Sequence, residues 1–187
     1  MPSLFLPLIA SALAILGTRQ ARLVAQLSAR LGGNAALLAV CWLTAAFATT
    51  AVAWGGAALA PLMPPEGKTM FVAAALAAAG LELVWPMRKA APREPTRSLG
   101  AIALVLLAGQ VTDAARFLVL ALGVATAHWQ LAAAGGTLGS GAVLTVAWSL
   151  GHQWEERLPL RAIRTALAAT FVIAAVVVAM TARGIIG

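Results

Sequence analysis

The sequence is poor in charged residues. Only 10% of its 187 residues are Asp, Glu, Lys or Arg, 61% are hydrophobic, and the mean hydropathy is +0.91. A soluble domain carries charge on about 25% of its residues to cover its surface. This composition therefore excludes an ordinary soluble protein and predicts a chain surrounded by membrane lipid.

Cysteine is scarce and the common catalytic motifs are missing. Cys41 is the one cysteine, which excludes an internal disulfide and any CxxC metal or redox site. The sequence contains no P-loop, HExxH, GxSxG or dinucleotide fingerprint, so no motif indicates an enzyme or a cofactor. The net charge of +7 comes from basic residues spread between apolar stretches, so nucleic acid is not an expected partner.

What the sequence does contain is a series of apolar segments that approach the ~20 residues of a membrane-spanning helix. They cover residues 3–28, 35–61, 69–87, 99–124, 127–151 and 160–183. We therefore expect an all-α polytopic membrane protein with six transmembrane helices. A basic linker at 88–98 divides the chain into a first three-helix half, 1–87, and a second, 99–187.

Basic residues between the apolar segments predict the orientation. On one side of the expected bundle lie Arg30, Arg88, Lys89, Arg93, Arg97, Arg157, Arg161 and Arg164, and on the other Lys68 and Arg183. Because basic loops stay cytoplasmic, we expect an integral protein of a bacterial inner membrane with both termini outside the cytoplasm. Three spans on each side of the linker also predict two inverted three-helix repeats, as in secondary transporters.

The fourth segment contains GQVTDAARFLV, residues 109–119, which brings charge into an otherwise apolar helix. Ionisable side chains near the bilayer centre are costly and need a partner, water or a function. On a continuous helix Gln110, Asp113 and Arg116 share one face, and Asp113 can pair with Arg116. This face is predicted either to line a substrate or proton path, or to hold helices together through a self-neutralised ion pair.

The first segment contains a related polar cluster. An offset of 95 residues places ILGTRQARL, 15–23, beside QVTDAARFL, 110–118. Four polar side chains then form a stripe at helical spacing: Arg19, Arg22, Gln26 and Arg30. Two interpretations are open: a helix interrupted near Gly17–Thr18 whose basic face lines a cavity, or an interfacial amphipathic segment whose arginines reach lipid headgroups.

Other polar residues are expected to have structural roles. Glu82, near the end of the third segment, is predicted to be interfacial with basic neighbours, and a ligand role is the alternative. Interfacial anchors are expected at His128, His152, Trp85, Trp129 and Trp154. Gly135 and Gly139 form a GxxxG motif that would let another helix approach closely.

Several stretches resemble one known family. They are LSARLGG at 27–33, WPMRK at 85–89, and the segment at 128–180 that starts HWQLAAAGG and includes ERLPLRAIR. On these residues the chain resembles the Gdt-type calcium/manganese:proton exchangers, a group that includes Golgi and bacterial manganese transporters. The resemblance implies six spans in two inverted halves with a cation site at the midplane.

The family signature is E-x-G-D-[KR]-[ST], once in each half, and the resemblance implies that its acids bind the cation. Here Gly17, Arg19 and Asp113 match the signature. The positions that depart from it are Ile15, Thr18, Gln110, Thr112, Ala114 and Ala115. Asp113 is thus the one signature acid that is kept.

The resemblance implies a secondary transporter that exchanges manganese or calcium for protons, with Asp113 and Gln110 as metal ligands. The substrate path is expected to include Thr18, Arg19, Gln20, Thr112 and Arg116. Because a hard divalent ion prefers several carboxylate oxygens, two alternatives stay open. The chain could carry an anionic or neutral solute bound by arginines, or be a non-transporting subunit. Expected partners are membrane lipid, the transported ion or solute, and a second subunit in a homo- or heterodimer.

Overall fold

A computed structural model describes residues 2–85, 98–111 and 113–185. Within these ranges all regular structure is helical. The elements are α1 (Pro2–Leu16), α2 (Arg19–Leu31), α3 (Ala35–Leu59), η1 (Ala60–Leu62), α4 (Pro65–Val84), α5 (Leu99–Val111), α6 (Ala114–Thr126), α7 (Trp129–Leu150), α8 (Gln153–Arg157) and α9 (Leu160–Ala182). The expectation of an all-α chain is confirmed, and the predicted linker at 88–98 lies, except for Ser98, outside the described residues.

Four helices are long and apolar enough to cross a membrane. They are α3 with η1, α4, α7 and α9. Two further crossings arise if each bent helix pair is one span: α1 with α2, at 64°, and α5 with α6, at 61°. The described chain therefore has four candidate spans, or up to six, as expected of an integral membrane protein.

The two bends have a common backbone cause. Thr18 precedes α2 with φ −85° and ψ 165°, and Asp113 precedes α6 with φ −82° and ψ 135°. Both residues are extended, so neither helix continues through them. The break near Gly17–Thr18 was one of two interpretations of the first segment. The continuous helix expected over 99–124 is wrong, because Asp113 is an N-cap and not a helical residue.

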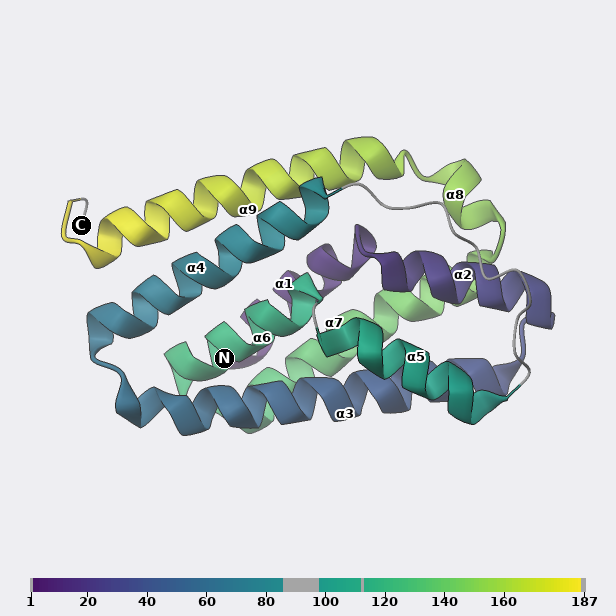
Figure 1. Ribbon diagram of the computed structural model, residues 1–187, viewed down its shortest axis with the longest axis horizontal. Helices are drawn as coiled ribbons and strands as arrows, with labels where there is room; N and C mark the ends of the chain where they lie inside the picture. Colours follow the sequence, from purple (N-terminus) through teal and green to yellow (C-terminus); the bar gives the residue numbers. More distant parts are fainter. Residues whose placement is uncertain (1, 86–97, 112, 186–187) are drawn as a thin grey trace.

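The spans alternate in direction along the bundle (Figure 1). In that view α1 and α2 run from left to right, α3 returns, and α4 runs to the right again. The second half runs oppositely, since α5 and α6 go to the left, α7 to the right and α9 to the left. Both chain ends consequently lie toward the left, whereas the α2–α3 turn and α8 lie at the right.

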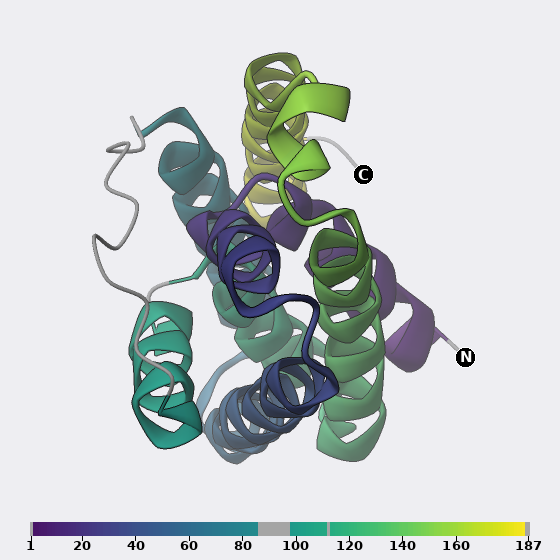
Figure 2. The ribbon, with the colours of Figure 1, turned by 90° about the vertical axis from the view of Figure 1, so that its right-hand side faces the viewer.

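The element bounds of the two halves correspond at the offset of 95 residues. Helix α6, 114–126, corresponds exactly in its bounds to α2, 19–31, and α9 begins at the position that corresponds to the start of α4. Figure 2 looks along the bundle and places α2 near its centre and α5 at its margin. Helix α6 packs against α1, α3, α4 and α7, so the region around its first turn is enclosed by both halves.

One predicted anchor is buried. Trp154 was expected at the membrane interface, but it is 1% exposed in the core. The short helix α8 turns back after α7 and packs against α2 and α7, which covers the indole. Trp85, in contrast, is 68% exposed. The prediction for Trp154 failed because the sequence does not reveal that the segment after α7 folds back.

The GxxxG motif of α7 brings α1 into close contact, as predicted. A Cβ at Gly135 would overlap the carbonyl oxygen of Leu4, and one at Gly139 would overlap that of Leu8 and the hydroxyl of Ser11. The absence of side chains at these two positions therefore lets the helix backbones touch.

We predict that Gly139→Ala destabilises the protein by about 1–3 kcal/mol, because the added methyl group forces α1 away from α7. Gly55→Ala is the matched control, since a Cβ at that helical position meets nothing within 4 Å. Its greater helix propensity should make the control neutral or stabilising by up to about 1 kcal/mol. Thermal unfolding of the purified variants in detergent measures both effects, and equal melting temperatures would contradict the close packing.

Candidate functional site

The break before α6 is held by hydrogen bonds to all four amides of its first turn. Ala114 N–H donates to a carboxylate oxygen of Glu82 in α4. Ala115 N–H donates to Asp113 Oδ1 at 3.1 Å. The amides of Arg116 and Phe117 donate to the Asp113 carbonyl oxygen at 2.9 and 3.2 Å. Two carboxylates thus meet the positive end of the α6 dipole, where negative charge is stabilised.

The break before α2 lies close to the same region. Thr18 Oγ1 donates to the carbonyl of Ile15 at 3.0 Å, and Thr18 is 5% exposed. Gln20, also 5% exposed, donates from Nε2 to the carbonyl of Leu106 in α5 at 3.2 Å. The first turn of α2 therefore contacts α5 one turn before Gln110, and we call the buried polar residues at the two breaks the polar cluster.

Arg116 lies at the centre of this cluster. Its guanidinium donates from Nη2 to Gln110 Oε1 at 2.5 Å and from Nη1 to Ser140 Oγ of α7 at 3.1 Å. Gln110 in turn donates from Nε2 to Thr44 Oγ1 of α3 at 3.3 Å. Arg116 is 2% exposed and Gln110 is 1% exposed. The side chains of α3, α5, α6 and α7 are thereby joined by one buried hydrogen-bond network.

The local ion pair expected between Asp113 and Arg116 is not formed. Asp113 is outside the helix, and its Oδ1 accepts from Ala115 N–H. Arg116 instead reaches back across the break to neutral acceptors. In the described part of the chain Arg22 and Glu155 form an ion pair, at 2.6 Å near the right-hand end of the bundle.

Glu82 belongs to the site, although the sequence indicated such a role for it only as an alternative. The favoured interpretation placed it at the membrane interface, whereas the structure places its carboxylate on the first amide of α6. Arg164 of α9 lies beside it and donates to the carbonyls of Leu83 and Trp85 at 2.7–3.1 Å. The signal that could have found Glu82 is an acid inside a 20-residue apolar helix.

Three buried polar atoms of the cluster have no hydrogen-bond partner among the described residues. They are Gln20 Oε1, Asp113 Oδ2 and Arg116 Nε. Such atoms are rare in protein interiors, because each costs about 1–3 kcal/mol when it is left unpaired. Two acceptors and one donor are therefore available to a bound water, ion or polar solute.

The predicted site residues divide into three groups. Thr18, Gln20, Gln110, Asp113 and Arg116 are all buried, with Arg116 hydrogen-bonded to Gln110 and Gln20 to the α5 backbone. Arg19 is exposed at the start of α2, on the outer side of the break. Thr112 lies outside the described residues. The basic stripe of α2 points partly outward, where Arg22 and Gln26 both donate to Glu155.

The donor set around Asp113 differs from a site built of acids. Among residues 2–85, 98–111 and 113–185 no group of three or more His, Cys, Asp or Glu side chains is placed to hold a metal ion. The cluster offers carboxylate, amide and hydroxyl oxygens, which suit a hard cation. It also contains the Arg116 guanidinium, which donates a hydrogen bond to Gln110 Oε1. Gln110 is one of the two metal ligands that the resemblance implies.

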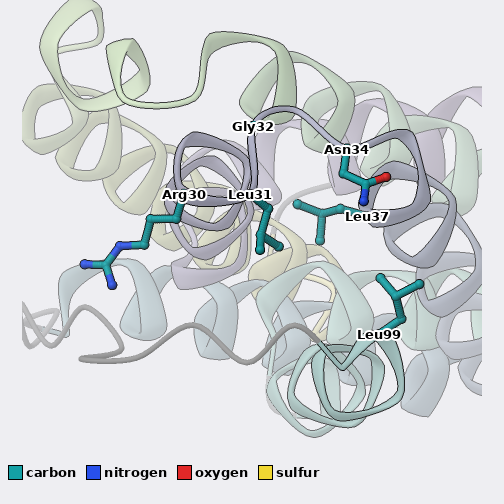
Figure 3. A pocket seen from close by; sticks show the side chains of 6 residues that line it. All are labelled: Arg30, Leu31, Gly32, Asn34, Leu37 and Leu99. Atoms are coloured by element: carbon teal, nitrogen blue, oxygen red, sulfur yellow. The ribbon is translucent and has the colours of Figure 1, made fainter.

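A separate cavity of about 430 Å³ lies at the right-hand end of the bundle. It is lined by Arg30, Leu31, Gly32, Asn34, Leu37 and Leu99, from the α2–α3 turn and the start of α5 (Figure 3). None of these residues belongs to the buried cluster. The cavity is thus a surface feature of the arginine-containing end and not the lining of the helix breaks.

Comparison of the chain with protein-family models, with curated proteins and with solved structures gives no match.

We predict that Gln110→Leu destabilises the protein by about 2–4 kcal/mol, because it removes an acceptor from a buried guanidinium. The double variant Gln110→Leu/Arg116→Met should recover part of this loss, since the buried guanidinium that needs Gln110 as an acceptor is then absent. Gln130→Leu, at an exposed position of α7, is the control. Thermal unfolding in detergent of the unmodified protein, the two single variants and the double variant measures the double-mutant cycle. Additive effects of the two substitutions would show that Gln110 and Arg116 do not interact.

Proposed function

We propose that this chain is a secondary transporter whose translocation site is the polar cluster at the two helix breaks. The observation that carries the proposal is that two helix pairs are interrupted at corresponding positions, Thr18 and Asp113, and that both residues are buried, with the start of α2 hydrogen-bonded to α5. Interrupted spans that point helix ends and polar side chains at one another are typical of transporter binding sites. A scaffold of packed helices needs no such buried polar groups.

We further propose six spans arranged as two inverted three-helix repeats. Support comes from the corresponding element bounds and from the opposite running directions of the two halves (Figure 1). The basic end, with Arg30, Arg157 and Arg161, would face the cytoplasm, and both termini would lie outside it. A reporter enzyme that is active only outside the cytoplasm should be active when fused after Gly187. An inactive fusion at that end would contradict this orientation.

Packing differs between the two first spans in a way that suits alternating access. Helix α1 contacts α7 through Gly135 and Gly139, whereas the corresponding positions on α3, against which α5 packs, are Val40 and Thr44. In residues 99–110 of α5 the buried side chains are Ile102, Leu106 and Gln110. Helix α5 is therefore the less tightly held of the two, and we propose that its movement opens the site toward the right-hand, basic end.

For the substrate, the leading proposal is exchange of manganese or calcium for protons, as the resemblance implies. Asp113 would be ligand and proton acceptor, with Gln20 Oε1 as a second oxygen, and protonation of Asp113 would release the ion. An anionic or neutral solute is the second candidate, because a buried Arg116 with a free Nε offers a donor that a divalent cation cannot use. A non-transporting partner role is the third candidate, and transport by the isolated chain would exclude it.

We predict that the purified protein in liposomes takes up radiolabelled manganese or calcium when a pH gradient is imposed. Asp113→Asn should lower the rate by roughly 100-fold or more, because the variant has neither the charge nor the proton acceptor. Glu66→Gln, at the exposed start of α4, is the control and should transport as the unmodified protein does.

The same liposomes separate the candidates. Uptake that is absent at every pH gradient would reject cation exchange, and uptake that is unchanged by Asp113→Asn would remove Asp113 from the mechanism. For the second candidate the probes are phosphate, acetate and glycerol, and Arg116→Gln should abolish uptake of the anionic ones. If none of these probes enters, the isolated chain does not transport any of the proposed solute classes.

A further inference from the structure

We propose that the cavity at the basic end of the bundle binds one anionic phospholipid, with the lipid phosphate at Arg30 and part of an acyl chain against the leucines. The inference rests on the cavity and not on the proposed transport function, because none of the lining residues belongs to the polar cluster. It gives the cavity a ligand of defined chemistry and joins that ligand to three helices.

The cavity lies at a level of the bundle where lipid headgroups are expected. Asn34, one of its lining residues, immediately precedes the candidate membrane span Ala35–Leu62, and Leu99 is the first residue of α5. The start of a span lies near the boundary between the hydrocarbon and the headgroups. Figure 2 places α5 at the margin of the bundle, so one wall of the cavity belongs to an outer helix. A lipid that diffuses in the membrane plane therefore meets this cavity at the periphery of the protein.

The lining is divided into an apolar part and a polar part, as a phospholipid is. Figure 3 shows that the side chains of Leu31, Leu37 and Leu99, from α2, α3 and α5, surround one space. The guanidinium of Arg30 extends away from them at one edge of the cavity. The volume of about 430 Å³ lies within the range of roughly 300–1,000 Å³ that is typical of small-molecule sites.

The charge of the lining favours an anion. Arg30 is the charged residue of the lining, and in the part of the chain that the structure describes no acidic side chain lines the cavity. A guanidinium has five N–H donors, so it serves more than one acceptor, and its geometry suits phosphate oxygens. Asn34 Oδ1 accepts from Ala36 N–H at 2.8 Å, so Nδ2 is the atom of this side chain that donates to a ligand. Basic pockets between membrane helices bind anionic headgroups in this way.

A lipid accounts for the leucines, whereas a soluble phosphate does not. Leu99 is 40% exposed beside the cavity. An acyl chain that covers its side chain removes apolar surface from water, which is favourable, but a hydrated phosphate ion leaves this surface uncovered. The separation of the guanidinium from the three leucines therefore favours a ligand that is charged at one end and apolar at the other.

The test is a lipid titration of the purified protein in detergent, followed by native mass spectrometry. We expect one dioleoylphosphatidylglycerol to bind about 10-fold more tightly than dioleoylphosphatidylcholine, because its net negative charge is paired with a guanidinium. Glycerol 3-phosphate, which has the phosphate and no acyl chain, should not bind at the concentration that saturates the protein with the anionic lipid. The bound lipid should also raise the melting temperature, since it binds the folded protein.

Two pairs of variants locate the site. Arg30→Gln should weaken phosphatidylglycerol binding by about 10-fold. Arg161→Gln, an exposed arginine at the same end but outside the cavity, should change it by less than about twofold, because exposed charges apart from the ligand are screened. Leu99→Trp should fill the apolar part and weaken binding by about 10-fold. Leu104→Trp, at a 69% exposed position of the same helix, is its control and should bind as the unmodified protein does.

Equal affinities for the two lipids would overturn the proposal. Equal losses in Arg30→Gln and Arg161→Gln would do the same, because the lipid would then respond only to the net charge of this end. Tight binding of glycerol 3-phosphate would identify a soluble phosphate as the ligand and reject the lipid. Unchanged melting temperatures of the lipid-free variants verify the fold. Failure of transport leaves the result intact, because the titration contains no transported solute.

Discussion

A helix that starts inside an apolar bundle must find acceptors for its first amides, and this requirement determines the centre of the molecule. In water these groups would be solvated, but in lipid or in a packed core each unpaired amide is costly. The four amides at the start of α6 are satisfied by Glu82 from α4 and by the side chain and carbonyl of Asp113. One of these acceptors comes from another helix, so the hydrogen bond of Glu82 links α4 to the start of α6.

The same requirement explains why a buried arginine is tolerated. Arg116 follows the capped turn, and its guanidinium finds Gln110 across the break and Ser140 on α7. Gln110 remains available because α5 has ended and its last turn faces the core. On a continuous helix the guanidinium would have to be neutralised by Asp113 or leave the core. The interruption therefore gives Asp113 and Arg116 different hydrogen-bond partners while both stay in the interior, with an unpaired atom on each.

The sequence predicted the coarse fold because apolar length and breakers are local properties. The long apolar helices could be derived in this way, as could a close helix contact at Gly135 and Gly139, whereas the break at Asp113 and helix α8 could not. The site was predicted less completely. Its residue types were recognised, but helical spacing was applied across Asp113, which is extended, so the wrong pairing followed.

Glu82 and Trp154 show more clearly what the sequence could not predict. Their positions depend on contacts between segments far apart in the chain, 32 residues for Glu82 and Ala114. Hydropathy predicted that both residues lie near the ends of spans, and in the sequence they do. It does not predict which helix covers each side chain. A buried position near a span end arises from the tertiary arrangement, here from α8 folding back and from α4 lying beside α6.

The two breaks correspond in position at the offset of 95 residues, but their chemistry differs. At the first break Thr18 makes no side-chain hydrogen bond to the amides of α2, and its hydroxyl donates backward to Ile15. Arg19 follows it on the exposed side. At the second break two carboxylates and a guanidinium converge. In the described part of the cluster the buried charged side chains therefore lie at the start of α6, and the start of α2 contributes the Gln20 amide and the exposed Arg19.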